Sequence, residues 1–362
     1  MTSAFGSSIF SAATRVIAKE YDVSITVGIL GVSLYVLGFA FGPTLWAPLS
    51  ELKGRRLPLV IATFGFAVFN IANATAQDLQ TILITRFFAG FFGACPLAVV
   101  AAVFSDMFDN RTRGIAITVF SMTVFTGPLL APFTGGFIVD SDLGWRWTSY
   151  IVSFMGFLAF GLCLLFLEET YPPVILVAKA SELRRRTLNW GIHAKQEEIE
   201  VDFRELVSKN FSRPMRLLFG EPIIAALSVY MSFIYGLLYL FLTAYPMVFQ
   251  GVYHMSAGVS GLAFFGMIVG QLIAGVAVLL QQPWYQRKLA ANNGVPIPEW
   301  RLPSVIAGGA AFAAGLFWFG WGGYRAEVHW IVPVLSGLLS GFGLLSIFLQ
   351  ALNYLVDSYL ML

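Results

Sequence analysis

Charged residues are scarce in this chain of 362 residues. Asp, Glu, Lys and Arg make up 12% of it, against about 25% in an average soluble domain. Hydrophobic residues make up 57%, against about 45–50%. The net charge of +2 offers no strongly basic surface for nucleic acid. The composition therefore excludes an ordinary soluble domain and favours a chain that lies in lipid.

Histidine and cysteine are rarer still. Cys95 and Cys163 fall inside apolar stretches, so we expect two free, reduced thiols. The three histidines, at 193, 254 and 329, show no spacing typical of a metal site. No phosphate-binding loop motif is present, which argues against an ATP-driven pump. We therefore expect no metal, no cofactor and no enzyme activity.

Apolar stretches long enough to cross a bilayer recur along the chain. A helix needs about 20 apolar residues to span the hydrocarbon core. Nine stretches meet this requirement, so the sequence predicts an all-α polytopic membrane protein. They lie near residues 25–49, 57–76, 80–104, 114–139, 147–167, 222–249, 256–280, 302–322 and 330–351.

Lysine and arginine lie mostly in the loops on one side of these predicted crossings. That side includes the turn around Lys53 and the long segment 169–221. The opposite side keeps only Arg15, Lys19, Arg146 and Arg325. Cytoplasmic loops of membrane proteins are rich in Lys and Arg. We therefore predict that segment 169–221 is cytoplasmic.

The long polar segment divides the predicted crossings into two halves. We expect an N-terminal half at 1–168, a linker at 169–221 and a C-terminal half at 222–362. Apolar residues at helical spacing in 201–220 predict an amphipathic helix along the membrane surface. The halves echo each other weakly. Glycines at 90 and 93 match those at 341 and 343, and the basic pair at 55–56 matches the pair at 287–288.

The first 14 residues are mildly apolar, but Arg15 and Lys19 follow too soon for a complete crossing. One alternative is a surface helix. The other, which we favour, is the outer half of a first crossing whose inner half is absent. At the other end, the chain stops at Leu362, just past the last predicted crossing.

Polar residues form stripes on two predicted crossings. Since lipid-facing positions do not collect hydroxyls and amides, both stripes are expected to face inward. They either line a cavity, which we favour, or make hydrogen bonds between helices. In the seventh crossing, counting the partial first one, the stripe is Ser228, Ser232, Tyr235, Tyr239 and Thr243; in the tenth it is Ser336, Ser340, Ser346, Gln350, Asn353 and Asp357.

Arg86 is the only basic residue well inside a predicted crossing. A cation in the membrane implies a partner or a water-filled cavity. The alternative is that its side chain extends to the outer interface, since the crossing begins near Gln80. We favour a functional role at the central cavity.

Two segments predict helices that bend and pack closely. Residues 47–56 form a short basic turn in which Gly54 permits a tight reversal. Residues 127–136 place glycines and prolines inside an apolar stretch, where lipid-embedded helices tolerate them. These are Gly127, Pro128, Pro132, Gly135 and Gly136.

These motifs resemble those of the major facilitator superfamily. Residues 47–56 resemble its loop signature, 86–90 the arginine motif of its fourth helix and 127–136 the antiporter motif of its fifth. The segments at 235–240, 315–319 and 353–359 resemble the fungal twelve-span drug:proton antiporters, which include polyamine exporters. The resemblance covers essentially the whole chain.

The resemblance implies a helical bundle with about 9–10 of the usual 12 crossings. It implies proton-coupled export of small organic compounds, such as drugs or polyamines, by alternating access in the plasma membrane. One alternative is a facilitator or importer of the same fold without proton exchange. Another is a truncated remnant that does not transport. Two residues depart from the superfamily pattern: Glu51 replaces an aspartate and Ala131 replaces a glycine.

Candidate site residues follow from the stripes and from the resemblance. We expect Glu51 to pair with Arg55 or Arg113, and Asp106 to pair with Arg113. The alternative is that the basic residues only set the orientation of the chain in the membrane. The candidates for gating are Glu51, Gly54, Arg55, Arg56, Asp106, Arg113, Gly127, Pro128, Pro132, Gly135 and Gly136. The candidates for substrate binding are Arg86, Gly90, Ser228, Ser232, Tyr235, Tyr239, Ser340 and Asn353.

Overall fold

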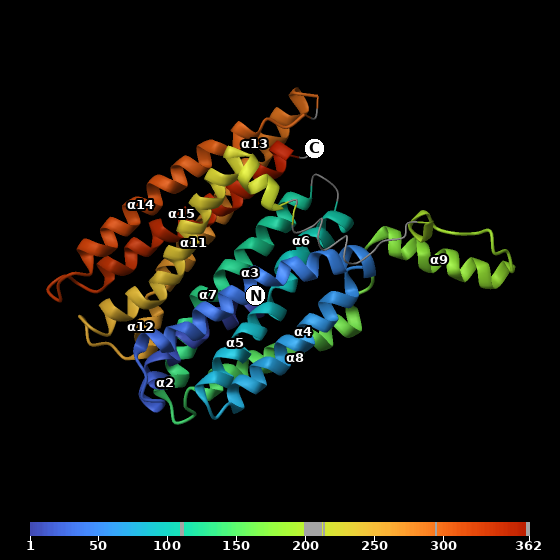
Figure 1. Ribbon diagram of the computed structural model, residues 1–362. Coiled ribbons are helices and arrows are strands. Elements are labelled where there is room, and N and C mark those ends of the chain that lie inside the picture. The colour runs from blue at the N-terminus through green and yellow to red at the C-terminus, as the bar shows by residue number, and fades with distance from the viewer. Residues whose placement is uncertain (109–111, 199–211, 213, 294, 360–362) are drawn as a thin grey trace. The chain divides into compact units, whose positions relative to one another are not determined.

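The chain folds into helices. The computed structural model describes residues 1–108, 112–198, 212, 214–293 and 295–359, and every regular element in these ranges is helical (Figure 1). Within them, nine helical segments are long and apolar enough to cross a membrane. Each overlaps one of the nine predicted stretches, so the all-α polytopic fold is confirmed.

The helices group by their contacts into two compact units. Unit 1 consists of Met1–Val32, Asn110–Ser149 and Gly220–Leu362, and unit 2 consists of Ser33–Asp109 and Tyr150–Phe219. This grouping differs from the halves drawn from chain order, because residues near 113–140 pack with C-terminal helices. The division at 169–221 stays a prediction.

Unit 2 contains all or most of the first, second, third and fifth candidate crossings of the described chain, and part of the linker. α3 and α8 pass into it from unit 1. Its elements are α3 (Ile25–Lys53), α4 (Arg56–Thr75), α5 (Leu79–Gly93), α6 (Cys95–Met107), α8 (Arg146–Phe166), α9 (Pro172–Thr187) and the 3-10 turn η2 (Lys195–Glu198).

Unit 1 contains the N-terminal helices, α7 and the C-terminal helices. Its elements are α1 (Thr2–Ile9), η1 (Phe10–Ala13), α2 (Thr14–Glu20), α7 (Arg113–Asp140), α11 (Pro222–Phe249), α12 (Ala257–Leu262), α13 (Phe265–Ala291), η3 (Pro298–Arg301), α14 (Leu302–Gly322) and α15 (Ile331–Tyr359).

Prolines lie inside several helices without ending them. α3 continues through Pro43 and Pro48 to Lys53, so most of the predicted turn at 47–56 is helical and the reversal is confined to Gly54 and Arg55. α7 continues through Pro128 and Pro132. A soluble helix would lose about 3 kcal/mol or more at each such proline. The expectation that lipid-embedded helices tolerate them is confirmed.

Glycines bring helix backbones into direct contact in two helix pairs. In unit 2, a Cβ added to Gly38 of α3 would overlap the Phe87 carbonyl oxygen, and one added to Gly90 of α5 would overlap that of Tyr35. In unit 1, the carbonyl of Leu338 leaves no room for a Cβ on Gly270, nor that of Met267 for one on Gly341. These glycines are close-packing positions, as small residues at membrane helix interfaces are.

The N-terminal helix α1 is buried along α7. Its residues from Ser3 to Ile9 are all buried. A Cβ on Gly127 would meet the Phe5 amide nitrogen at 2.9 Å, and one on Gly135 would meet the Ile9 carbonyl oxygen at 2.8 Å. The surface-helix alternative for the first 14 residues is therefore wrong, because this helix has a buried partner along its length.

The amphipathic helix predicted in the linker lies mostly outside the described residues, which there include only 212 and 214–220. Instead, the structure shows a helix earlier in the linker, α9. This helix was not predicted from the sequence, because its apolar residues are interrupted by Lys179 and a run of arginines.

Candidate functional site

A buried ion pair joins the start of α4 to the end of α6 in unit 2. Arg55 directs Nε to an Asp106 carboxylate oxygen at 3.0 Å and donates from Nη1 to Ser50 Oγ at 2.9 Å. Its guanidinium carbon lies 4.6 Å from the centre of the Tyr171 ring. The Arg55 side chain is 9% exposed and the Asp106 side chain is 15% exposed. A charge-assisted hydrogen bond in such surroundings is stronger than a neutral one.

The carboxylate of Glu169 closes the turn between α3 and α4. It accepts hydrogen bonds from the backbone N–H groups of Arg55, at 2.8 Å, and Arg56, at 3.1 Å. The N–H groups of Thr170 and Tyr171 also donate to it. Glu169 thus satisfies N–H groups that the start of α4 leaves unpaired, and its negative charge suits a helix N-terminus.

Gly54 is required at this turn for two reasons. Its φ angle of +87° is one that side chains with a Cβ rarely adopt. A Cβ at this position would also overlap the Glu169 carboxylate. The predicted role of Gly54 in a tight reversal is therefore confirmed.

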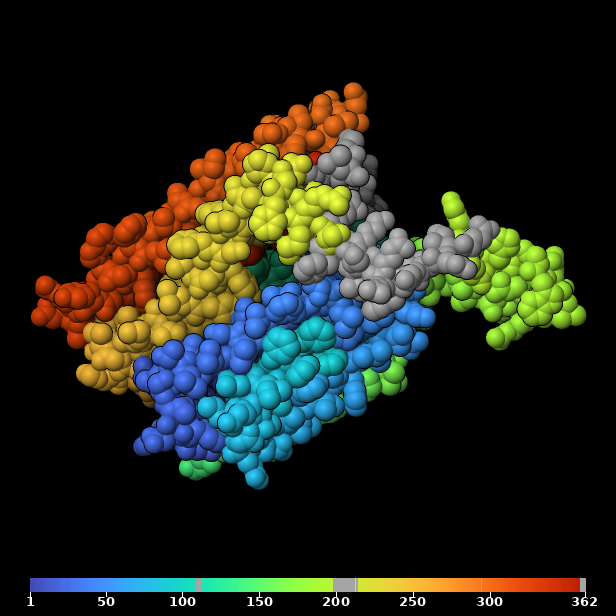
Figure 2. Space-filling model, viewed as in Figure 1, coloured from blue at the N-terminus to red at the C-terminus, as the bar shows by residue number. Residues whose placement is uncertain are grey.

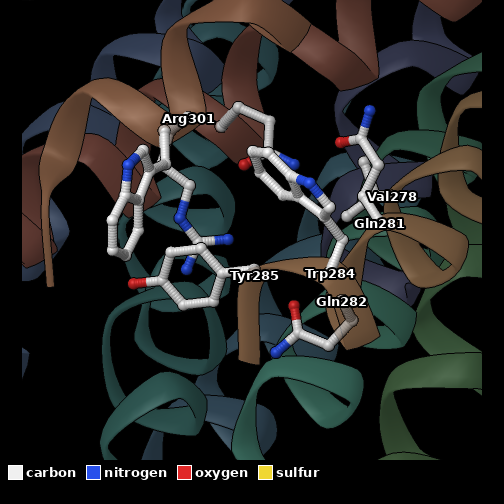
Figure 3. Close-up of a pocket in the computed structure, with 8 residues that line it drawn as sticks. Val278, Gln281, Gln282, Trp284, Tyr285 and Arg301 are labelled. Carbon is white, nitrogen blue, oxygen red and sulfur yellow. The ribbon is translucent and has the colours of Figure 1, made fainter. Parts of the chain in front are cut away.

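A second cluster in unit 1 has the same composition. Arg301 directs Nε to an Asp357 carboxylate oxygen at 3.0 Å, and the Tyr285 hydroxyl donates to the same oxygen at 2.8 Å. The guanidinium carbon of Arg301 lies 3.6 Å from the centre of the Tyr285 ring. Figure 3 shows the two side chains next to each other. This arrangement joins η3, α13 and the end of α15.

Arg301 is the structural counterpart of Arg55. Each is the residue immediately before a crossing helix begins, α4 for Arg55 and α14 for Arg301. Each pairs with an aspartate at the end of another crossing and lies over a tyrosine ring. The echo predicted between the basic pairs at 55–56 and 287–288 stays a prediction, and Arg301 was not part of it, because that comparison used pairs of basic residues and not positions relative to a helix start.

A small pocket lies beside the Arg301 cluster. Its lining combines aromatic rings with amides, and Figure 3 shows Tyr285, Trp284 and Arg301 around it. It has room for about one water molecule. Gln350, another lining residue, has a buried Oε1 that accepts no hydrogen bond from the described part of the chain. A water molecule here would satisfy that acceptor.

Hydroxyls and aromatic rings meet at a separate cluster in unit 1. The Tyr239 hydroxyl donates to Ser7 Oγ at 2.9 Å. The Tyr235 hydroxyl lies 3.4 Å from the Tyr239 hydroxyl. The Tyr235 ring packs on Tyr239 at 5.1 Å and on Phe348 at 5.8 Å between centres. Phe125 of α7 continues the row, 5.1 Å from Phe348. We call these five residues the tyrosine cluster.

The tyrosine cluster draws on α1, α7, α11 and α15. Ser7 is fully buried, whereas Tyr235 and Tyr239 are half-buried. On α11 a different stripe packs into the protein, including Ile234, Leu238 and Phe241. The predicted polar stripe is therefore not the packing face of this helix. Half-buried phenols offer a flat apolar surface together with a hydrogen bond.

Arg86 of α5 is buried in unit 2. Its guanidinium carbon lies 4.3 Å from the centre of the Tyr35 ring, which is itself fully buried. A desolvated cation–π contact contributes about 2 kcal/mol. The burial of Arg86 does not fit the alternative in which its side chain reaches the outer interface.

The glycines of α7 lie on two contact faces of the helix. Gly127 and Gly135 face α1 and η1, whereas a Cβ on Gly136 would meet the Ala257 carbonyl oxygen at 2.5 Å, on the α12 side. Asp140 at the end of α7 accepts a hydrogen bond from the Gly258 N–H at 2.8 Å. Ala131 is fully buried, so its extra methyl group is accommodated.

Gln271 of α13 attaches to α7 just before its first proline. Its amide nitrogen donates to the Met122 carbonyl at 2.8 Å and to Thr126 Oγ1 at 2.9 Å. Gln271 is fully buried. It supplies the kind of side-chain hydrogen bond between helices that holds proline-containing membrane helices in place.

Several predicted site residues lie outside these clusters. Ser340 contacts α14, where a Cβ on Gly315 would overlap its hydroxyl, and Gly90 lies at the crossing of α3 and α5. Ser228 and Asn353 are half-buried, and Ser232 is exposed. Their proposed part in substrate binding stays a prediction.

The gating residues are described only in part. Asp106 pairs with Arg55, and Glu51 is exposed. The expected pairings with Arg113 stay predictions. Arg56 donates instead to the Leu164 carbonyl at 3.0 Å. The side chain of Arg113 lies outside the described residues. Asp106 lies within reach of Arg55 because α6 ends beside the start of α4.

The residues of these clusters that were missed from the sequence include Ser7, Glu169 and Arg301. Ser7 lies in a segment whose crossing was incomplete, and Glu169 follows α8 in a stretch with no recognisable motif. For Arg301 a signal existed, since it directly precedes an apolar stretch as Arg55 does.

Comparison with curated proteins finds fungal relatives along nearly the whole chain. The uncharacterized transporter C36.03c of Schizosaccharomyces pombe is 51% identical over 99% of this chain and 67% of its own length. The Major facilitator superfamily multidrug transporter FLU1 of Candida albicans is 49% identical over 98% of this chain and 59% of its own length. The chain thus spans about two thirds of the length of the curated relatives it matches.

Solved structures show the same fold at low identity. The xylose transporter XylE from E. coli matches with a TM-score of 0.69 and 16% identity, over 99% of this chain and 82% of that one. The human organic anion transporter MFSD10 matches with a TM-score of 0.56 and 18% identity, over 97% and 76%. A sequence profile described as Major Facilitator Superfamily matches residues 1–360. The chain is an integral membrane protein that belongs to the Major Facilitator Superfamily.

Proposed function

We propose that this protein transports small organic compounds across a membrane and exports them in exchange for protons. The superfamily assignment supports transport. Export of drug-like compounds is supported by two relatives that are named multidrug transporters, FLU1 of Candida albicans and TPO1_2 of Candida glabrata. The predicted orientation, with segment 169–221 in the cytoplasm of a plasma-membrane protein, belongs to the same proposal.

The tyrosine cluster is the observation that carries the substrate class. Two half-buried phenols and the Ser7 hydroxyl lie beside the rings of Phe348 and Phe125. Flat rings bind bulky apolar compounds by contact area, and they attract organic cations through their π faces. Hydroxyls add hydrogen bonds without a fixed charge. Such a surface suits several weakly polar or cationic compounds better than one sugar.

The two arginine–aspartate clusters supply gating elements. Each joins the start of one crossing to the end of another, so breaking it frees both helix ends. An ion pair that is made in one conformation and broken in the other biases the equilibrium between them. We infer that Arg55–Asp106 and Arg301–Asp357 stabilise one state of an alternating-access cycle.

Transport by purified protein in proteoliposomes tests this proposal. The probes are radiolabelled spermidine and the fluorescent cation rhodamine 6G, with a pH gradient imposed across the vesicle membrane. We expect accumulation of a probe against its gradient, lost when a protonophore collapses the pH gradient. Tyr235→Ala should reduce transport about tenfold, equivalent to losing about 1.4 kcal/mol of binding. No transport of either probe, with the protein correctly folded, would contradict the proposal.

One observation favours a facilitator as the second candidate. In the described crossings, carboxylates such as Glu51, Asp106, Asp140 and Asp357 lie at or near helix ends. A central proton carrier is therefore not evident in this part of the chain. A facilitator would equilibrate the same probes at an unchanged rate after the pH gradient is collapsed. That outcome would replace antiport by facilitated diffusion and keep the substrate class.

A further inference from the structure

Large apolar side chains are exposed on α9, which is not among the helices long enough to cross a membrane. Leu176 is 57% exposed and Leu183 48%. In the turn that follows, Leu188 and Trp190 are each 77% exposed. In the space-filling view, the yellow-green side chains of this segment are open on the face shown (Figure 2). Apolar residues gathered in this way mark an interaction surface.

The exposed leucines share one side of the helix. At 100° per residue, Leu176 and Leu183 lie within about 20° of each other. Lys179 and Arg186 flank them on the same side, and Ala178 lies roughly opposite. Arg186 forms an ion pair with Glu182. Long basic side chains beside leucines allow the stems to follow an apolar surface while the charged groups reach water or phosphate.

The turn after α9 is held closed by Arg184. Its guanidinium makes two hydrogen bonds to the Glu197 carboxylate, at 2.9 and 2.7 Å, and a third to the Ile192 carbonyl at 3.1 Å. Leu188 adopts a left-handed conformation with φ of +54°, which ends the helix. The exposure of Leu188 and Trp190 thus belongs to a folded turn.

The position of α9 along the chain indicates what covers this side. α8 crosses the membrane and ends at Phe166, and α9 begins at Pro172. Five residues separate the two helices, a reach of at most about 18 Å. Glu169, in the middle, is held by the start of α4. The first turn of α9 therefore lies within about 18 Å of the end of a candidate crossing, close enough to reach the headgroup region.

We propose that α9 and its turn lie in the membrane interface, with Leu176, Leu183, Leu188 and Trp190 inserted at the boundary of the acyl chains. Lys179 and Arg186 would bind the phosphates of anionic phospholipids. Short amphipathic helices with tryptophan and basic residues bind membranes in this manner. This surface is separate from the tyrosine cluster, so its function does not depend on the transport proposal.

Lipid-attached quenchers test this placement in the full-length chain. Thr187→Cys places a thiol on the leucine side, and Ala178→Cys places a matched thiol on the opposite side. Both are made with Cys163→Ala, while Cys95 is fully buried and is retained. Each thiol carries a nitrobenzoxadiazole dye in vesicles of phosphatidylcholine alone or mixed with phosphatidylserine in equal parts. Phospholipids with a nitroxide on the acyl chain serve as quencher.

We expect quenching at position 187 to exceed that at 178 by about twofold or more, and to increase with phosphatidylserine. Leu176→Gln with Leu183→Gln should lower quenching at 187 to the level of 178. Lys179→Gln with Arg186→Gln should remove the increase with phosphatidylserine. Equal quenching at both positions would overturn the proposal. A second result would also overturn the proposal: a dye at position 187 that is equally shielded from water in detergent and in vesicles, and is not quenched. Protein would then cover the leucine side of the helix.

Discussion

Arg301 repeats the position and the contacts of Arg55. Both direct Nε to an aspartate oxygen at 3.0 Å, both lie over a tyrosine ring, and both precede the first residue of a crossing. α4 is the second and α14 the eighth of the nine candidate crossings in the described residues, so the two are six positions apart in the series. The weak echo between the halves of the sequence thus has a concrete structural form.

Arg55→Ala and Arg301→Ala should each lower the free energy of unfolding by about 3 kcal/mol, since each leaves a mostly buried aspartate without its cation. Thermal unfolding of the purified protein in detergent measures this. Double-mutant cycles with Asp106→Ala and Asp357→Ala should give coupling energies of about 1–3 kcal/mol. Arg56→Ala is the matched control, because its exposed guanidinium binds only a carbonyl among the contacts described here. An equal loss in that control would contradict the assignment.

Gly54→Ala should destabilise the protein by about 2 kcal/mol or more, because a Cβ is strained at positive φ and would displace the Glu169 carboxylate. Glu169→Ala should have a comparable effect, since the backbone N–H groups of Arg55 and Arg56 would lose their acceptor. Unfolding in detergent reports both changes. Gly144→Ala separates backbone strain from the clash, because Gly144 has a φ of +76° with no atom within 4 Å of an added Cβ.

Tyr239→Phe should lower the free energy of unfolding by about 0.6 kcal/mol, the average for a hydrogen bond between membrane helices. Transport of rhodamine 6G should fall more steeply than this loss implies if the hydroxyl contacts substrate. Tyr245→Phe is the control on the same helix. The buried Tyr245 hydroxyl has no hydrogen-bond partner in the described chain, so its removal should leave stability unchanged or raise it. Equal transport by both variants would argue against a substrate role for Tyr239.

The turn after α9 should open in acid. The Arg184 guanidinium, helped by the Ala194 N–H, lowers the pKa of Glu197 from an ordinary 4.5 to about 2. A carboxyl whose pKa is lower in the folded state stabilises that state above its ordinary pKa and loses the effect as pH falls through the folded value. Amide exchange in residues 187–197, corrected for the intrinsic rate, should therefore rise between about pH 4.5 and pH 2.

Glu197→Gln gives the matching control for this pH dependence. It should show fast exchange in residues 187–197 already at neutral pH, and no further rise in acid beyond the intrinsic rate. A wild-type turn that stays protected down to pH 2 would contradict the role given to the Arg184–Glu197 pair.

Length and composition predict the crossings well because lipid imposes a simple physical rule. Each crossing must pair its own backbone groups over about 20 apolar residues, and this constraint is visible in any stretch of the chain. The contacts of Gly38 and Gly270 also have a local signal, since Gly38 and Gly42, like Gly266 and Gly270, are small residues four apart in an apolar helix, a spacing typical of backbone contact. These features depend only on local sequence.

The candidate site was less predictable because it depends on contacts between distant residues. Glu169 binds the turn at Gly54 from the far end of α8, and no local pattern links the two. Ser7 meets Tyr239 from a segment whose crossing could not be recognised by length. The pair of Arg55 and Asp106 was not predicted, because the two residues are 51 positions apart in sequence and only the packing of α6 beside α4 brings them together.

The interlocked glycines of α13 and α15 have a mechanical consequence. Where Gly270 meets the Leu338 carbonyl and Gly341 meets that of Met267, no flexible side chain lies between the two backbones to absorb a shift. A slide along this seam would force main-chain atoms into one another. α13 and α15 are therefore expected to move together as one rigid unit. Bending that accompanies a change of conformation would then occur in helices that contact their neighbours through longer side chains.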